Sequence, residues 1–291
     1  MDGGQQDQSA QSREFAKPSD LFRWCLRHAT HDVHGINYRT CFAEYVGAAQ
    51  ADGYLWRQYD RRLESLIAAV RPGLKVLEVG CGLGHDLCWT ALRGATSVGI
   101  DIKSEMTGFA EQLLALVRRE IDATIAVDIR HTNLMAMDPA EQFDFIYMKD
   151  TLHHLEPRAE VIDKLASLLA PGGHILIVEP NAWNPLIQFQ MFRIRGFKTV
   201  IRKTDVATGE EFVYGNERLL TGGTMIRLFR HAGISGSTRS FRLLPTRLSG
   251  RSGLARVASR IEARRLERLV PLLPVHTVFF GRKDRLAGAG Q

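Results

Sequence analysis

The stretch that decides the fold runs from Leu74 to Asp86 and reads Leu-Lys-Val-Leu-Glu-Val-Gly-Cys-Gly-Leu-Gly-His-Asp. Its first half carries the apolar run Val76, Leu77 and Val79, which predicts a buried strand. Glycines follow at positions 80, 82 and 84, and a helix is expected to begin at His85. Glycines let the backbone turn sharply and let a ligand approach the main chain, and the first turn of a helix presents unpaired N–H groups. The stretch therefore predicts a loop that cradles a ligand.

The spacing of the glycines narrows the class of ligand. A dinucleotide-binding turn needs the pattern GxGxxG, but the third place after Gly80 and Gly82 holds His85. A phosphate-binding P-loop ends in Gly-Lys-Ser/Thr, which does not follow here. The segment Glu78-Val79-Gly80-Cys81-Gly82-Leu83-Gly84 resembles the first motif of the class I S-adenosylmethionine (SAM)-dependent methyltransferases, in which an acidic residue within an apolar strand precedes GxGxG.

A second acidic residue supports this resemblance. Residues 96–102, Thr-Ser-Val-Gly-Ile-Asp-Ile, predict the next strand, and Asp101 stands at its tip, 17 positions after Gly84. A carboxylate there can accept two hydrogen bonds from ribose hydroxyls, and the alternative is a solvated aspartate at a strand end. The methyltransferase family places its ribose-binding acid at this spacing, which favours the first interpretation.

Later segments extend the resemblance and imply the fold. Residues 168–176, Leu-Leu-Ala-Pro-Gly-Gly-His-Ile-Leu, are similar to the LxPGGxL turn before the fifth strand of the family. Helices and strands alternate from residue 74, with further strands expected at 121–129, 143–148, 174–179, 233–244 and 275–281. The resemblance, best over residues 55–179, implies an α/β fold: a Rossmann-like seven-stranded sheet, mostly parallel with an antiparallel last strand, and helices on both faces.

The remaining segments predict the domain organisation. The polar residues 1–18 predict disorder. Helices expected from Ser19, over 38–48 and over 55–70 would form an N-terminal helical cap at 19–72, and 73–291 would be the methyltransferase domain, with no further boundary. Residues 181–217 interrupt the alternation after strand five and mix aromatic with basic side chains. Both an ordinary packed helix and a lid or membrane-facing entrance for a hydrophobic acceptor fit this pattern.

Composition excludes several classes of protein. Of the 291 residues, 45% are hydrophobic and 24% charged, as in ordinary globular proteins, and no apolar run reaches the ~20 residues that a membrane-spanning helix needs. The four cysteines lack Cys-x-x-Cys spacing, which fits the reduced cytoplasm and argues against a disulfide framework or a zinc site. A net charge of +6 is modest for a nucleic-acid binder. We therefore expect a cytoplasmic protein without a nucleic-acid partner.

The resemblance implies SAM as cofactor and S-adenosylhomocysteine as its product. It places Glu78 near the methionine amino group, Asp101 on the ribose and Ile102 beside the adenine. Asn133 stands where the family usually has an aspartate for the adenine amino group, and Asp128 is a nearby competitor. The expected cofactor-binding residues are Glu78, Gly80, Cys81, Gly82, Gly84, Asp101, Ile102, Asn133, Leu134 and Lys149.

Two adjacent histidines are the candidate catalytic residues. Residues 149–155, Lys-Asp-Thr-Leu-His-His-Leu, are similar to a Leu-His-His-Leu segment that follows strand four in many family members. His153 or His154 could act as a general base, since an imidazole pKa of about 6.5 suits neutral chemistry; a structural hydrogen bond is the alternative. Some quinone-pathway methyltransferases bind a metal in this loop through a run richer in Glu. Asp150, His153 and His154 depart from that run, so no metal is expected.

Together these features predict a methyltransferase with a small acceptor that is hydrophobic and biosynthetic: a secondary metabolite, quinone or lipid-like molecule. Because pockets for such acceptors are mostly apolar, Tyr38, Trp183, Phe189 and Tyr214 are expected to line this one. Peripheral membrane contact is left open. The alternative is a methyltransferase that acts on a macromolecule such as RNA or protein. Strand four ends in Met-Lys-Asp-Thr, however, and not in the Asn-Pro-Pro-Tyr of base N-methyltransferases.

Overall fold

The computed structural model describes residues 14–30, 32–33, 35–48, 53–204, 209, 211–249, 251–264 and 270–285. The chain divides into two compact units. The first comprises Met1–Asn133 and Thr246–Ala255, and the second comprises Leu134–Pro245 and Arg256–Gln291. This division does not follow the predicted boundary between a cap over 19–72 and a domain over 73–291, which stays a prediction.

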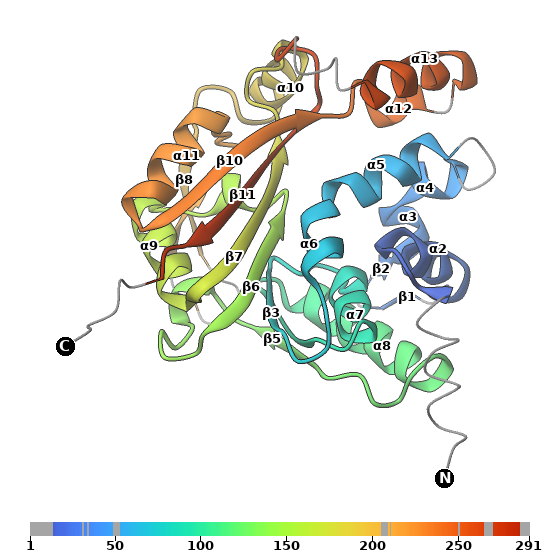
Figure 1. Cartoon of the computed structure of the whole chain (residues 1–291), viewed down its shortest axis with the longest axis vertical. Helices are drawn as coiled ribbons and strands as arrows, with labels where there is room; N and C mark the ends of the chain where they lie inside the picture. The colour runs from blue at the N-terminus through green and yellow to red at the C-terminus, as the bar shows by residue number, and fades with distance from the viewer. Residues whose placement is uncertain are drawn as a thin grey trace. The chain divides into compact units, whose positions relative to one another are not determined.

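One sheet of seven strands has the order β10-β11-β7-β6-β3-β4-β5. β11 runs antiparallel to both β7 and β10, whereas β3, β4 and β5 pair in parallel, as do β6 and β7. The predicted Rossmann-like sheet with an antiparallel last strand is therefore confirmed (Figure 1). Helices pack on the strands within each unit: α7 on β4, α8 on β5, α9 on β7 and α11 on β10.

In the first unit, short parallel strands alternate with helices. The elements are β3 (Lys75–Val79), α7 (His85–Leu92), β4 (Thr96–Asp101), α8 (Ser104–Glu120) and β5 (Val127–His131). Four of the five residues in β3 and four of the six in β4 are buried, which explains why both strands read as apolar runs. The predicted third strand at 121–129 begins later, at Val127. Asp122 delays it, because its Oδ1 accepts from the backbone N–H of Thr124 (2.8 Å) and closes a turn after α8.

Short helices precede these strands, as predicted, but they are more broken than expected. They are α2 (Pro18–His28), α3 (Tyr38–Cys41), α4 (Ala43–Ala48), α5 (Tyr54–Arg62) and α6 (Glu64–Ala69), with a small hairpin of β1 (Asp32–Val33) and β2 (Ile36–Asn37) after α2. The predicted disorder over 1–18 needs correction at its end. Residues 1–13 lie outside the described residues, but Phe15 is buried, and its carbonyl accepts from Trp89 Nε1 at 3.0 Å.

The second unit continues the alternation and holds the insertion. It contains η1 (Leu134–Ala136), β6 (Phe143–Lys149), η2 (Leu152–His154), α9 (Arg158–Leu168), β7 (Leu169–Pro180), α11 (Gly222–His231), β10 (Ile234–Phe241) and β11 (His276–Lys283). The insertion folds as α10 (Pro185–Arg195) followed by an antiparallel hairpin of β8 (Val200–Thr204) and β9 (Glu211–Gly215), which the sequence did not predict. Before β11, the chain forms α12 (Thr246–Ser249), which belongs to the first unit, and α13 (Ser252–Ala263), which begins in the first unit and ends in the second. Among the described helices, none is long and apolar enough to cross a membrane.

Candidate active site

The glycine loop between β3 and α7 is shaped by its backbone. Gly80, Gly82 and Gly84 have φ angles of 71°, 52° and 78°, in the left-handed region that favours glycine. The N–H groups of Gly80 and Cys81 both donate to the carbonyl of Ile100, at 2.8 and 3.0 Å, and so tie the loop to β4. A Cβ on Gly84 would lie 2.9 Å from the Cβ of Ala110. The loop therefore needs glycine for its conformation and for its contact with α8.

Asp101 lies at the tip of β4 and contacts this loop. Its Oδ2 accepts from Gly82 N–H at 3.1 Å, and its Oδ1 accepts from Lys103 N–H at 3.0 Å. An ionised carboxylate offers about four acceptor positions, so these two bonds orient the group and leave capacity for a ligand's hydroxyls. The side chain is half-buried rather than enclosed. A tight glycine loop next to an oriented carboxylate fits the amino-acid and ribose parts of SAM.

The other residues predicted to bind the cofactor are distributed over both units. In the first unit, Glu78 and Cys81 are buried, and the carbonyl of Ile102 lies 3.1 Å from His131 Nε2. Asn133 follows β5. In the second unit, Leu134 is buried in η1 and Lys149 ends β6.

The competitor of Asn133, Asp128, lies within β5. Its Oδ2 accepts from Arg130 Nε at 2.7 Å in an exposed ion pair. This pairing favours Asn133 over Asp128 for the adenine, which stays a prediction.

A buried polar group next to the glycine loop was missed by the sequence reasoning. Tyr59 donates its hydroxyl proton to Asp86, with 2.7 Å between the oxygens, and the same hydroxyl lies 2.7 Å from His85 Nε2. Burial raises the pKa of Tyr59, and the Asp86 carboxylate raises it further. Phe22 stacks on His85 with ring centroids 4.5 Å apart. This group joins α5 to the start of α7; no sequence pattern marked it, because its members are distant in the chain.

Tyr38 belongs to the same aromatic core. It is fully buried and stacks on Phe109 with ring centroids 5.7 Å apart. The structure thus places Tyr38 in the packed interior of the first unit, and its role in lining the acceptor pocket stays a prediction. The aromatic pattern of the N-terminal helices reflects core packing.

In the second unit, Glu179 holds the loop that carries the two histidines. Glu179 is 1% exposed near the end of β7, and its Oε1 accepts from the N–H groups of Thr151 (3.0 Å) and Leu152 (2.8 Å). Its Oε2 lies 2.6 Å from His153 Nδ1. One carboxylate therefore positions both the backbone of η2 and the ring of His153. We call His153, His154, Glu179 and Glu217 the histidine cluster.

His153 lies between two carboxylates. Its Nδ1 faces Glu179, and its Nε2 lies 3.4 Å from Glu217 Oε2, while the residue is 4% exposed. Burial by itself lowers the pKa of His153, but the negative charges of Glu179, Asp150 and Glu217 outweigh it and raise the pKa above the ordinary value. The geometry favours a positively charged, immobilised imidazole.

His154 has the opposite character. Its side chain is 27% exposed, and its Nδ1–H donates to the carbonyl of Gly215 at 2.9 Å, which leaves Nε2 as the acceptor. Nε2 lies 4.0 Å from Glu217 Oε1, beyond hydrogen-bond distance. Burial, and then the neighbouring His153, lower the pKa of His154. The ring stacks on Tyr214 with centroids 4.7 Å apart, and Lys203 Nζ lies 3.4 Å from the centre of the Tyr214 ring.

Of the four predicted acceptor residues, Tyr214 alone contacts a candidate catalytic histidine among the described interactions. Trp183, just before α10, is 58% exposed, and Phe189, on α10, is 61% exposed.

The candidate metal ligands also differ from the expected ones. Ligand atoms of His153, His154 and Glu217 lie within 4.8 Å of one another, whereas Asp150 is not part of this group. The donor types suit a transition metal, and a carboxylate on the second nitrogen, like Glu179 on His153 Nδ1, is common at metal-ligating histidines. The predicted absence of a metal stays a prediction.

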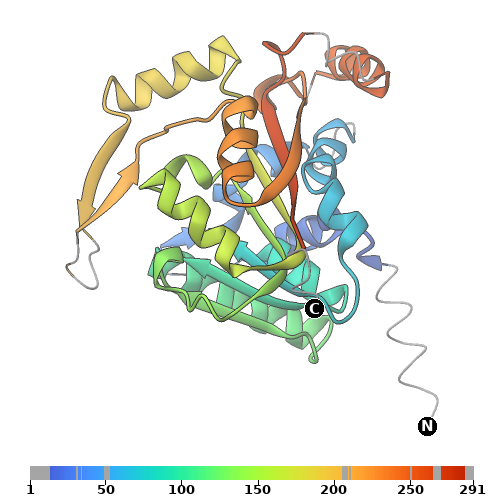
Figure 2. The ribbon, with the colours of Figure 1, turned by 60° about the vertical axis from the view of Figure 1, so that its left-hand side comes forward.

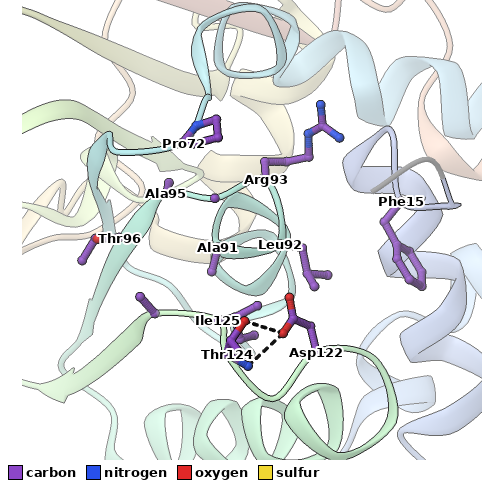
Figure 3. Close-up of a pocket in the computed structure, with 12 residues that line it drawn as sticks. Phe15, Pro72, Ala91, Leu92, Arg93, Ala95, Thr96, Asp122, Thr124 and Ile125 are labelled. Atoms are coloured by element: carbon purple, nitrogen blue, oxygen red, sulfur yellow. Dashed lines mark hydrogen bonds between the residues drawn. The ribbon is translucent and has the colours of Figure 1, made fainter. Parts of the chain in front are cut away.

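A cavity of about 400 Å³ in the first unit lies elsewhere. It is lined by Pro72, Leu92, Arg93 and Thr96 among others, near the amino end of β4 (Figure 3). Asp101 stands at the carboxyl end of that strand. The cavity contains none of the predicted site residues, and parallel sheets bind ligands beyond their carboxyl ends. We therefore do not assign it to the active site.

Comparison with known proteins shows the family of this chain. Residues 52–233, more than half of the chain, match the family model described as a methyltransferase domain. The chain belongs to this methyltransferase family. The predicted resemblance to SAM-dependent methyltransferases, and SAM as the family's cofactor, are thereby confirmed.

Individual relatives are partial matches. The chain is 32% identical over 167 residues to a ubiquinone biosynthesis O-methyltransferase of Marinobacter nauticus, covering 56% of this chain and 64% of that protein. It is 33% identical over 110 residues to phosphoethanolamine N-methyltransferase 1 of Zea mays, covering 37% of this chain and 21% of that protein. The chain thus spans less than two thirds of the length of these relatives.

Solved structures agree on the fold. A putative sarcosine dimethylglycine methyltransferase from Galdieria sulphuraria matches with a TM-score of 0.54 at 16% identity, covering 79% of this chain and 85% of that one. A [4+2]-cyclase, SpnF, matches with a TM-score of 0.50 at 17% identity, covering 79% and 83%. Since this fold also serves a cyclase, the reaction has to be argued from the site.

Proposed function

We propose that the protein transfers the methyl group of SAM to a hydroxyl of a small, hydrophobic acceptor, with His154 Nε2 accepting the hydroxyl proton. One observation carries this proposal: the two adjacent histidines are differentiated. His153 is buried between two carboxylates with a raised pKa, whereas His154 is partly exposed with a lowered pKa and an oriented Nε2. Neighbouring groups whose pKa values are pushed apart are typical of acid–base sites.

The chain's own residues would act in two places. SAM supplies an electrophilic methyl group, and the glycine loop and Asp101 would hold it by its polar parts. In the second unit, Glu179 fixes η2 through two backbone N–H groups, and Gly215 fixes the tautomer of His154. Neutral His154 would accept the proton as the acceptor oxygen attacks, and Glu217, 4.0 Å away, would stabilise the imidazolium that forms. Positioning of the reactants supplies much of the remaining rate enhancement.

Two observations support a hydroxylated, apolar acceptor. Several relatives are named ubiquinone biosynthesis O-methyltransferases, and a base that is neutral at neutral pH suits a hydroxyl that loses its proton during attack. The ring of Tyr214 beside His154 offers a flat apolar surface. The macromolecular alternative has no comparable support: the charge excess is modest, and no nucleic-acid-binding motif was identified.

A labelling experiment tests the proposal. The purified protein is incubated with methyl-labelled SAM and with cell extract separated by polarity, with RNA and protein kept as separate fractions. We expect label in an apolar small-molecule fraction, in a bond that behaves as an ether. Label confined to RNA, protein or highly polar compounds would overturn the acceptor class. Absence of transfer to every fraction by a protein that binds SAM would overturn the proposed activity.

A further inference from the structure

The second unit carries an apolar surface that is too concentrated to be incidental. Of the thirteen large apolar side chains that are exposed among the described residues, seven lie within an 18-residue stretch: Trp183, Leu186, Phe189, Phe192, Ile194, Phe197 and Val200. Leu186 is 74% exposed and Phe197 is 91% exposed. Single exposed apolar residues are normal, but a contiguous group of them marks an interaction site.

This stretch is a fixed element. Asn184 caps α10, since its Oδ1 accepts from the N–H groups of Leu186 (2.9 Å) and Ile187 (3.2 Å). Its Nδ2 donates to the carbonyl of Leu273 at 2.9 Å, and Asn181 Nδ2 donates to the carbonyls of Pro271 and Pro274, both at 2.9 Å. The start of α10 therefore packs beside residues 270–274. Figure 2 shows α10 leading into the β8–β9 hairpin, both drawn in yellow to light orange.

Residues 270–274 extend the exposed apolar area. Leu272 and Leu273 are 51% and 57% exposed, and the side chain of Asn184 joins their segment to α10. We define the α10 surface as Trp183, Leu186, Phe189, Ile194, Phe197, Leu272 and Leu273. Met191 meanwhile faces inward and is buried. A helix that is apolar on its inner and its outer side normally has both sides covered, so the α10 surface calls for an occupant.

The charges around the α10 surface indicate which occupant. Residues 181–204 contain five basic residues and no acidic one: Arg193, Arg195, Lys198, Arg202 and Lys203. Arg193, Lys198 and Arg202 are exposed, and Arg202 alone of these three has a recorded acidic partner, Glu211 at 3.4 Å. Protein–protein interfaces are depleted in Lys at their centres. Trp, Phe and Leu beside Lys and Arg are typical of elements that lie in the headgroup region of anionic membranes.

We propose that the α10 surface docks the protein on a bilayer that contains anionic phospholipids. The apolar side chains enter the boundary between headgroups and acyl chains, and Arg193, Lys198 and Arg202 contact lipid phosphates. Docking is peripheral, in keeping with the absence of a spanning helix among the described residues. It does not depend on the reaction proposed above, so either can fail without the other.

Flotation with vesicles tests this docking on the full chain. Vesicles of phosphatidylcholine alone and of phosphatidylcholine with phosphatidylglycerol are compared at low and at high salt. We expect binding to the anionic vesicles that weakens as salt rises. The double variant Lys198→Glu/Arg202→Glu should bind about tenfold or more weakly, since each basic residue near an anionic surface contributes measurably. Leu186→Glu/Phe189→Glu should lose binding to the anionic vesicles at low and at high salt.

Matched variants elsewhere control for folding and overall charge. Arg119→Glu reverses an exposed charge on α8, and Val257→Glu replaces an exposed apolar residue on α13; both should bind like the wild type. Circular dichroism confirms that each variant is folded. The proposal is overturned if the wild type fails to float with anionic vesicles, or if the controls lose binding as strongly as the α10 variants. It is also overturned if the wild type self-associates without vesicles and Leu186→Glu/Phe189→Glu abolishes that association but not flotation.

Discussion

The glycine loop of the first unit and the histidine cluster of the second are fixed by different means. The loop is held by its own backbone: three left-handed glycines and two N–H groups that donate to Ile100. The cluster is held by side chains from separate segments, with Glu179 from β7, the histidines from η2 and Glu217 from the segment after β9. The conformation of the loop therefore requires residues without a side chain, whereas the geometry of the cluster requires particular side chains. Each dependence can be tested by substitutions that should damage one region and spare the other.

The largest effect is expected at His154. His154→Ala removes the proposed base and should lower kcat by about 10²–10⁴-fold, the range that general bases contribute. His231→Ala, which removes an exposed histidine at the end of α11, should leave kcat unchanged. Methyl transfer from labelled SAM measures both. Wild-type turnover in His154→Ala would show that this histidine is structural. The histidine cluster, like the glycine loop, would then only position bound molecules and take no part in proton transfer.

The pH dependence of turnover by the wild type also tests whether His154 is the base. A base works only when it is deprotonated, and burial together with His153 lowers the pKa of His154. The rate should therefore stay constant around neutral pH and fall as the pH drops through a value below about 6.5, the ordinary pKa of histidine. Measurement of kcat/KM against pH checks this. An acid limb centred well above that value would assign the titration to His153, whose pKa is raised.

Glu179→Gln should lower the free energy of unfolding by about 1.5–3 kcal/mol, as for a hydrogen bond to a charged group. Glu179 is the group that raises the pKa of His153 most. A histidine whose pKa is raised on folding stabilises the fold fully below its unfolded pKa of about 6.5. This stabilisation is lost as the pH rises through the folded pKa. The loss should accordingly be greatest in mildly acidic solution. Urea unfolding at several pH values measures it, with exposed Glu160→Gln on α9 as control. A loss independent of pH would contradict the charge assignment of His153.

Gly84→Ala tests the loop in the same way. The new Cβ would be placed at a φ of 78° and 2.9 Å from Ala110 Cβ, so the strain should lower the free energy of unfolding by about 1–3 kcal/mol. Gly223→Ala is the matched control, because its Cβ would meet nothing within 4 Å in α11. Thermal unfolding with and without SAM compares them. If Gly84→Ala were as stable as the control and bound SAM normally, the loop would not depend on glycine there.

The smallest effect is expected from chelation. Dialysis against EDTA should leave turnover unchanged, because no metal is needed for the proposed proton transfer. A loss of turnover that a divalent metal restores would instead make His153, His154 and Glu217 a metal site. The cluster would then differ from the loop in needing a bound ion.

The same contrast explains what the sequence could predict. The loop, Asp101 and the parallel strands follow from local patterns, because glycine spacing and apolar runs are consecutive in the chain. The pairing of His153 with Glu179 spans 26 positions, and Glu217 comes from 64 positions beyond His153, so no local pattern joins them. The stacking of Tyr38 on Phe109 was not predicted for the same reason: the sequence does not distinguish an aromatic residue that lines a pocket from one that packs in the core. The β8–β9 hairpin was missed because β8 is mostly exposed and places Val200 and Ile201 directly before Arg202 and Lys203, which gives it no apolar alternation.

We propose that the glycine loop binds the cofactor and that the histidine cluster acts on the acceptor. Calorimetric titration of SAM into wild type, Asp101→Ala and His154→Ala tests this most directly. Asp101→Ala should weaken SAM binding by about 1.5–3 kcal/mol, or about 10–150-fold, because a charged hydrogen-bond acceptor is lost. His154→Ala should bind SAM as the wild type does. Unchanged affinity in a folded Asp101→Ala, or a comparable loss in His154→Ala, would contradict the assignment of the glycine loop to the cofactor and of the histidine cluster to the acceptor.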